Sequence, residues 1–217
     1  VINCVGLTKR LPSSGNLTAA IFMNSLYPHR LAALCQAMGI RLIHFSTDCV
    51  FSGQQGNYSE QAVPDATDTY GRTKALGEVT GAGCLTLRSS MIGHELKQKT
   101  ELLEWFLAQR GPVVKGFRRA IFSGITTLEM ARVLADFVLP NPALTGLYHV
   151  SSVPIAKFDL LTKISRQYGH DVVMEPMDEP VLDRSLNSSA FRQLTGYLPP
   201  SWEEMLSVLH EARQRSP

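Results

Sequence analysis

The chain has 217 residues, of which 44% are hydrophobic and 18% charged, and its formal net charge is +2. This length and composition suit one large domain, or a domain with a small lobe, around a substantial core. Lysines and arginines are dispersed and do not alternate with aromatic residues, so nucleic acid is not expected as a partner. No apolar run reaches the ~18 residues of a membrane span and no signal peptide is visible, so we expect a cytoplasmic protein without a membrane partner.

The cysteines are isolated from one another in the sequence. None of them forms a Cys-x-x-Cys pair, and all four stand in apolar surroundings, at Cys4, Cys35, Cys49 and Cys84. We therefore expect reduced core thiols of a cytosolic protein, in preference to disulfides, and no metal site.

The first part of the chain alternates strand and helix patterns. Residues 1–6 predict a buried strand that runs into a turn at Gly6, and because domains do not usually begin inside their core, we expect a preceding segment or a second chain to complete the sheet. A helical pattern closed by Gly39 follows, with a bend or a restart expected at Pro28. The apolar run 40–46 predicts a second strand, which the chain leaves at Ser46-Thr47-Asp48.

The alternation continues to the end of the chain. After a segment of loop composition over 49–68, the patterns predict helices near 69–78, 100–109, 127–139, 157–168, 188–194 and 201–213, with strands near 84–88, 113–115, 146–150 and 172–174. Such an order predicts an α/β fold whose mostly parallel sheet carries helices on both faces.

The spacing of one pair of polar residues indicates a chemical role. Tyr70 and Lys74 are four residues apart, so on a helix they share a face, where the ammonium favours the phenolate and lowers the pKa of the tyrosine. A solvated helix face gives the same spacing. Gly6, Thr47 and the segment 88–91 all fall at predicted strand ends, and sites in parallel α/β folds lie at that edge of the sheet.

Several motifs resemble one enzyme family. They are Val1–Gly6, Asn24 with Pro28, His44-Phe-Ser-Thr-Asp-Cys-Val-Phe-Ser-Gly53, Tyr70-Gly-Arg-Thr-Lys74 with Leu76-Gly-Glu78, and Leu85–Ser90. In order and spacing these pieces resemble the extended short-chain dehydrogenase/reductase family, and within it the dTDP-4-dehydrorhamnose reductase branch. The resemblance implies a Rossmann-like, doubly wound domain over 1–112, N-terminally incomplete, and a small α/β substrate lobe mainly over 113–217.

The resemblance implies a catalytic triad. Thr47, Tyr70 and Lys74 occupy the matching positions, where the tyrosine donates a proton to a substrate carbonyl as hydride arrives from NADP or NAD. Lysine holds the phenolate and the nicotinamide ribose, and threonine binds the same carbonyl oxygen. Asn24 matches a helix asparagine that orients water or the lysine, although a plain polar helix residue explains it equally.

The resemblance also implies binding residues. The positions matching the cofactor site are Cys4, Val5, Gly6, Ser46, Tyr70, Lys74, Ser89 and Ser90, and Gly6 has an ordinary strand-end turn as its alternative. For the sugar nucleotide the matching positions are Thr47, Met91 and Arg118. The guanidinium groups of Arg118 and Arg119 suit the binding of a diphosphate. Alternatively, Met91 fills the core and the two arginines form a solvated pair on the surface.

Two departures from the family pattern affect the functional expectation. No glycine-rich phosphate turn stands within the 217 residues, so the choice between NAD and NADP is not readable. Thr47 is followed by Asp48-Cys49, whereas related dehydratases carry Asp-Glu there, which favours simple reduction. We therefore expect a reductase of nucleotide-linked keto-sugars for deoxysugar or cell-surface polysaccharide biosynthesis, with an epimerase and a non-catalytic regulatory protein as open alternatives. A homodimer is the expected assembly.

Overall fold

The computed structural model describes residues 1–9, 16–97, 99–111 and 113–215. Its largest sheet has the order β1-β2-β3-β8, formed by β1 (Ile2–Asn3), β2 (Leu42–Ser46), β3 (Cys84–Arg88) and β8 (Gly146–His149), and all of its neighbours pair in parallel. The strands β2 and β3 carry buried side chains on both faces, as expected for a parallel sheet covered by helices. The predicted Rossmann-like α/β fold is confirmed.

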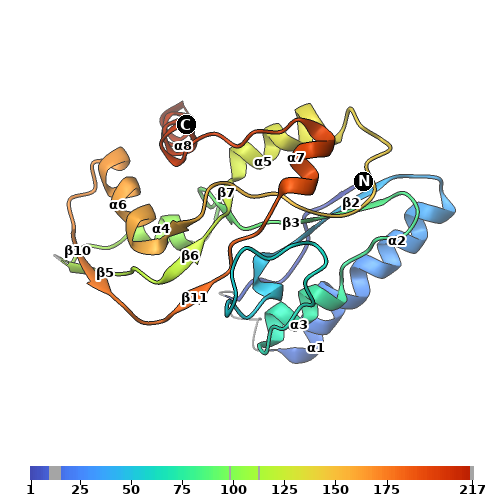
Figure 1. Cartoon of the computed structure of the whole chain (residues 1–217), viewed down its shortest axis with the longest axis horizontal. Helices are drawn as coiled ribbons and strands as arrows, with labels where there is room; N and C mark the ends of the chain where they lie inside the picture. The colour runs from blue at the N-terminus through green and yellow to red at the C-terminus, as the bar shows by residue number, and fades with distance from the viewer. Residues whose placement is uncertain (10–15, 98, 112, 216–217) are drawn as a thin grey trace.

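Helices cover both faces of this sheet (Figure 1). On one face lie α1 (Leu17–Ala20), the π-helical segment η2 (Ile21–Leu26), α2 (Tyr27–Ala37) and α3 (Thr69–Leu76), and on the other lie α5 (Thr127–Val133), its π-helical extension η4 (Leu134–Val138) and α7 (Ser189–Thr195). The crossover connections between parallel strands place helices in this way.

The first helix restarts at Pro28, one of the two outcomes expected there, since α2 begins at Tyr27 with the proline in its first turn. Just before it the chain widens into the π-helical segment, where the Tyr27 amide donates to the Phe22 carbonyl five residues back. Because Pro28 has no amide hydrogen and its ring crowds the preceding turn, a local change of helical pitch accommodates it. At the end of α3, a Cβ on Gly77 would lie 1.8 Å from the Asn24 carbonyl oxygen, so the two helices pack backbone to backbone.

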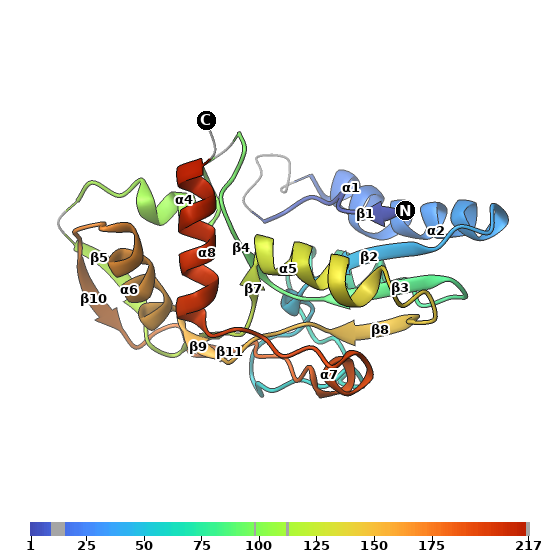
Figure 2. The same cartoon turned by 90° about the horizontal axis from the view of Figure 1, so that it is seen from above.

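A second region of short strands and helices adjoins the sheet. It contains the parallel pair β5 (Val113–Phe117) and β10 (Val173–Met177), and the strands β6 (Ala120–Phe122), β9 (Ile155–Ala156) and β11 (Leu182–Asp183). Its helices are α4 (Leu102–Leu107), α6 (Lys157–Tyr168) and α8 (Trp202–Arg215), and Figure 2 shows α8 standing between this region and α5. The pair β4 (Met91–Ile92) and β7 (Ile125–Thr126) joins the two regions.

One core runs through both regions. It includes Leu85 and Leu87 of the main sheet, Phe106 of α4 and Ile164 of α6, all fully buried. The predicted division after residue 112 stays a prediction, and β8 belongs to the main sheet. Five strands of two or three residues, β4, β6, β7, β9 and β11, were not predicted because so few residues show no periodicity.

Two burial expectations are corrected by the structure. The strand at the start of the chain is half-exposed, with Ile2 outward, because β1 is the edge of the sheet. All four cysteines are free, but Cys4 is exposed and Cys49 partly exposed, while Cys35 and Cys84 are buried. The thiols therefore do not all belong to the core.

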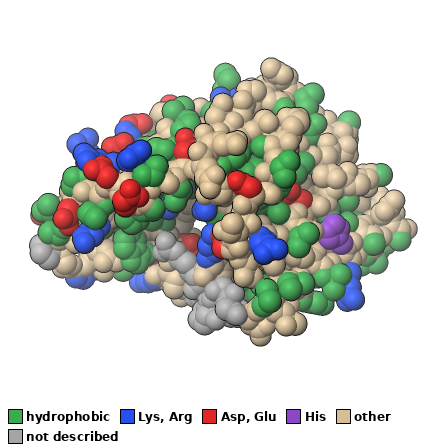
Figure 3. All heavy atoms as spheres, turned by 60° about the horizontal axis from the view of Figure 1, so that its bottom comes forward, with side chains coloured by type: hydrophobic (Ala, Val, Ile, Leu, Met, Phe, Trp, Pro, Cys, Tyr) green, Lys and Arg blue, Asp and Glu red, His purple; other side chains and the backbone are tan. Residues whose placement is uncertain are grey.

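The outer side of the α1–α2 segment is apolar. Hydrophobic side chains gather at the lower right of the view in Figure 3. The exposed hydrophobic residues of this segment include Leu17, Ile21, Phe22, Leu26, Leu34 and Met38. A row of this kind is a surface at which the expected homodimer could form, and the dimer stays a prediction. Within the described residues, no helix is long and apolar enough to span a membrane.

Candidate active site

A cavity of about 500 Å³ opens at the carboxyl edge of the main sheet. Ten of the residues singled out from the sequence line it, namely Cys4, Val5, Gly6, Ser46, Thr47, Tyr70, Lys74, Ser89, Ser90 and Met91. They come from the ends of β1, β2 and β3, from α3 and, in the case of Met91, from β4. The expected meeting of three strand ends at one edge is thus observed.

The helix α3 presents Tyr70 and Lys74 to this cavity. Its start is fixed by Asp68, whose carboxylate accepts a hydrogen bond of 3.0 Å from the Gly71 amide, and it ends at Gly77. Tyr70 and Lys74 both lie inside these caps, one turn apart. A short polar cap therefore sets the register of the pair against the sheet.

The ammonium group of Lys74 is buried and bound to the sheet. Its Nζ donates a hydrogen bond of 2.6 Å to the carbonyl oxygen of Phe45 on β2. Burial lowers the pKa of Lys74 to about 8, although the nearby Glu78 carboxylate acts to raise it. An ammonium has three donors, so two remain for a ligand.

Tyr70 differs from the expectation in its acidity. Burial raises the pKa of its phenol well above the ordinary value, and the neighbouring Cys49 adds to the rise while a hydrogen bond with Thr47 opposes it. The net lowering of the Tyr70 pKa expected from Lys74 is wrong for this structure, because burial outweighs the effect of the ammonium. Tyr70 is therefore fully protonated at neutral pH, the form that a proton donor needs.

Thr47 stands where β2 passes into the short 3₁₀ helix η3 (Asp48–Val50). Its side-chain oxygen accepts a hydrogen bond of 3.1 Å from the Cys49 amide and donates one of 3.2 Å to Asp48 Oδ1. Thr47 and Asp48 are both buried. The hydroxyl is thus held in place on the cavity wall.

A buried polar network joins the strand ends below the cavity. Glu78 accepts a bidentate pair of 2.7 Å hydrogen bonds from Arg88 on β3 and one of 2.6 Å from Ser46 on β2. Arg88 also donates to His149 on β8, whose other ring nitrogen then donates to the Tyr58 carbonyl. Burial, and the adjacent Arg88 charge, lower the pKa of His149 to about 3, so its ring is neutral.

Asn24 is a structural residue behind the loop that follows β1. It is buried, and its side-chain amide binds both the amide nitrogen and the carbonyl oxygen of Leu7, at 2.8 and 3.1 Å. A third hydrogen bond reaches Thr73 on α3. Its side chain therefore fastens the loop after β1 to the helix α3.

The structure does not bring Arg118 and Arg119 to the cavity. Arg118 is exposed and forms a 2.7 Å ion pair with the exposed Asp178, and Arg119 is exposed as well. A second cavity of about 190 Å³ adjoins the first, and the cations that line it are Lys157 and Arg184. The sequence offered no signal for these two, because they lie far along the chain from the catalytic motifs.

His94 is another cavity residue that the sequence did not single out. Its Nδ1 lies 2.7 Å from Glu104 Oε1 on α4 and its Nε2 lies 2.9 Å from the Tyr168 hydroxyl on α6. Since both ring nitrogens are engaged, His94 ties the cavity wall to the second region. The same wall includes Glu101 and Thr127.

A Rossmann-like sheet with a threonine at a strand end and a Tyr-x-x-x-Lys helix beside it defines the class of extended short-chain dehydrogenases/reductases. The comparison with family models narrows this class. Residues 1–212 match the model of the RmlD substrate binding domain. The chain belongs to that family.

Three similar proteins illustrate the relationship. The dTDP-4-keto-6-deoxy-D-glucose reductase of Streptomyces niveus is 39% identical over 79 residues, which are 36% of this chain and 27% of that protein. The probable low-salt glycan biosynthesis reductase Agl14 of Haloferax volcanii is 29% identical over 98% of this chain and 77% of its own length. The structure of dTDP-4-dehydrorhamnose reductase from Bacillus anthracis in complex with NADP superposes with a TM-score of 0.82 at 22% identity, covering 97% of this chain and 79% of that one.

Proposed function

We propose that this chain carries the catalytic site of an NAD(P)H-dependent reductase that converts the 4-keto group of a dTDP-linked deoxysugar to an alcohol, in deoxysugar or surface-polysaccharide biosynthesis. The named activities of the relatives support this choice of substrate. We place the reaction in the cytoplasm, where free thiols persist.

The observation that carries the proposal is the convergence of three groups on one cavity. Tyr70 supplies a protonated phenol, Lys74 a buried ammonium, and Thr47 a fixed hydroxyl, all on the wall of the same 500 Å³ space. Polar groups gathered in one concave site at a sheet edge are typical of an active site. These catalytic roles support reduction better than binding alone.

The cavity suits the nicotinamide end of a dinucleotide. A Cβ at Gly6 would lie 3.3 Å from Asn24 Oδ1, so the bare glycine lets this turn pack closely on Asn24 while its backbone lines the cavity. Cys4, Val5, Ser46, Ser89 and Ser90 surround the same space and would hold the cofactor with Lys74. The similar Bacillus anthracis reductase is in complex with NADP, which supports a nicotinamide cofactor for this chain but does not decide between NAD and NADP.

The residues of the chain account for the proton side of the reaction. When bound, the reduced nicotinamide supplies a hydride to the carbonyl carbon. Tyr70 donates its phenolic proton to the carbonyl oxygen, while the Thr47 hydroxyl proton turns from Asp48 to bind that oxygen as its negative charge develops. Lys74 holds the ribose with its free donors, and its charge stabilises the phenolate that Tyr70 becomes.

The second cavity provides charges for the diphosphate. Arg184 Nε donates to the Phe51 carbonyl at 2.8 Å and its Nη1 contacts Cys49 Sγ at 3.6 Å, both neutral acceptors. Within the described part of the chain it forms no ion pair. We propose Arg184 and Lys157 as the diphosphate contacts in place of Arg118, and a planar guanidinium suits that role.

The test is an assay of the full natural polypeptide with NADPH or NADH and a panel of dTDP-linked keto-sugars. We expect oxidation of the reduced cofactor that depends on the keto-sugar, with the alcohol as product. Dinucleotide binding without oxidation would favour the regulatory alternative. Inversion of a sugar hydroxyl without net oxidation would favour an epimerase.

Lys74 should impose an alkaline limit on this activity. Because the pKa of Lys74 is about 8, its charge is present below that pH and is lost as the pH rises through it. We expect kcat/KM, which reports on the free enzyme, to fall roughly tenfold per pH unit above about pH 8. Lys74→Arg keeps its charge and should lack this limb, at a lower overall rate. A level profile to about pH 10 in the unmodified enzyme would contradict the assignment.

A further inference from the structure

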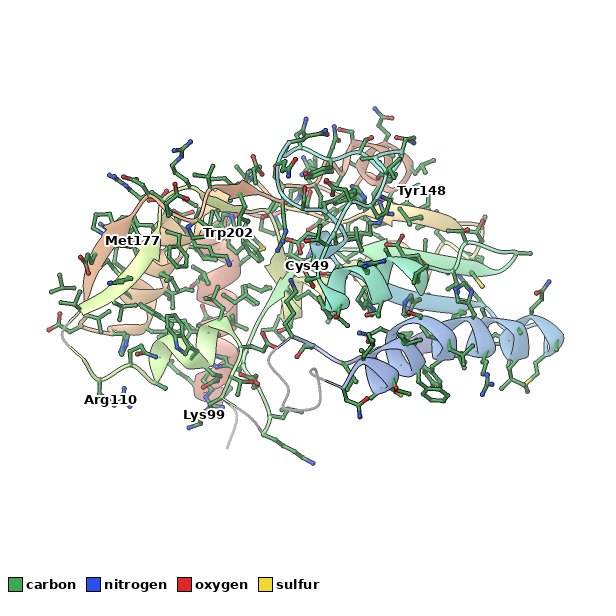
Figure 4. All side chains as sticks on the ribbon, turned by 90° about the horizontal axis from the view of Figure 1, so that it is seen from below. Cys49, Lys99, Arg110, Tyr148, Met177 and Trp202 are labelled. Atoms are coloured by element: carbon green, nitrogen blue, oxygen red, sulfur yellow. The ribbon has the colours of Figure 1, made fainter. Side chains whose placement is uncertain are left out.

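The two cavities meet at a shared wall, which we call the neck. The residues that line both cavities are Cys49, Ser90, Met91, Gly93 and Glu101. Figure 4 shows Cys49 near the centre of the molecule, where the main sheet meets the second region. The neck therefore lies between Tyr70 in the larger cavity and Arg184 in the smaller one.

Close backbone packing fixes the Cys49 side of the neck. A Cβ at Gly71 would lie 2.2 Å from the Cys49 carbonyl oxygen, so α3 presses directly on this segment. The Cys49 amide is bound to Thr47 in addition. Contacts this tight leave the backbone little room to yield to a larger side chain.

The opposite side of the neck is packed in the same manner. A Cβ at Gly93 would lie 2.1 Å from Thr127 Oγ1, and one at Gly124 would lie 2.2 Å from the Ser90 carbonyl oxygen. The loop that follows β3 is thus held against the start of α5. Both walls are closely packed, so we expect the width of the neck to depend on the side chains that project from them.

Cys49 contributes a small, uncharged group to this passage. Its sulfur contacts Arg184 Nη1 at 3.6 Å, and it is close enough to Tyr70 to affect the acidity of the phenol. Burial, and the adjacent Asp48 charge, raise the pKa of the Cys49 thiol to about 11, so it is neutral at physiological pH. It thus acts on a ligand through its volume.

We propose that the neck selects the substrate, and that the side-chain volume at Cys49 determines which sugar can extend through it from the anionic groups at Arg184 to the proton donor at Tyr70. This inference rests on the proposed function. A cavity that also receives the nicotinamide leaves too little room for a whole nucleotide sugar, so the substrate must cross the neck. Bulk at Cys49 then hinders the sugar while leaving the dinucleotide unaffected.

The test is a volume series at this position, Cys49→Ala, Cys49→Leu and Cys49→Phe, in the full natural polypeptide. We expect KM for the keto-sugar to rise with side-chain volume, reaching at least about tenfold for phenylalanine, with a smaller change in kcat, because binding is lost equally in the ground and transition states. The dinucleotide Kd should stay close to that of the parent protein. A KM independent of volume would overturn the proposal.

A second cysteine gives the matched control. Cys4 lines the larger cavity and does not line the smaller one, so Cys4→Phe should weaken the dinucleotide more than the sugar. Calorimetry measures binding without turnover. Cys49→Phe should weaken the binding of a dTDP-deoxysugar more than the binding of dTDP itself. Equal weakening of the two affinities would also overturn the proposal for the neck. If Cys49→Phe weakens the dTDP-deoxysugar selectively but the parent protein reduces no keto-sugar, the proposed reaction is wrong and the proposal for the neck is supported.

Discussion

Replacing Tyr70 with phenylalanine should lower kcat for keto-sugar reduction by a factor on the order of 10²–10⁴, the usual contribution of a positioned proton donor. The change removes the hydroxyl oxygen of a phenol that burial keeps protonated. The ring itself remains, so the cavity keeps its shape. Since Lys74 still has its ammonium for the ribose, the dinucleotide Kd should change by less than about twofold.

Tyr148→Phe is the matched control for this variant. Tyr148 lies on β8, outside both cavities, and its ring packs near that of Phe191. The same hydroxyl deletion there should leave kcat at the parent value. If Tyr70→Phe retained more than about a tenth of the parent kcat, another group would have to deliver the proton.

Replacing Glu78 with glutamine should be the most destabilising change near the site. The Arg88 guanidinium is 4% exposed and the Glu78 side chain 9%, so the variant leaves a buried charge facing an amide. Breaking a buried pair in this way costs about 3–5 kcal/mol of unfolding free energy. In a chain of this size, that corresponds to a fall in the thermal midpoint of roughly 6–20 °C.

Asp178→Asn provides the comparison for the buried pair. It breaks the Arg118–Asp178 pair, whose side chains are 53% and 62% exposed, and should cost less than about 1 kcal/mol. Because Glu78 also acts to raise the pKa of Lys74, Glu78→Gln should move the alkaline limb of kcat/KM to lower pH. Equal destabilisation by the two variants would show that burial adds nothing to the Glu78–Arg88 pair.

Local patterns carried much of the fold. The predicted strand 84–88 and helix 157–168 match β3 and α6 residue for residue, because each has a clear apolar pattern and α6 a glycine stop. The short strands were missed for the opposite reason. In the first helix, Pro28 correctly signalled the restart of α2, but the π-helical segment before it was not predicted.

The sequence by itself determined the spacing of Tyr70 and Lys74 and the strand ends that face them, because helix and sheet periodicities are local. Only the tertiary structure decided the acidity of the two groups, since desolvation depends on every element packed around them. It also brought Arg184 to the Cys49 thiol across 135 positions of the chain. Contacts at such separations leave no periodic trace in a single sequence, so the proton donor was predictable and the neck beside it was not.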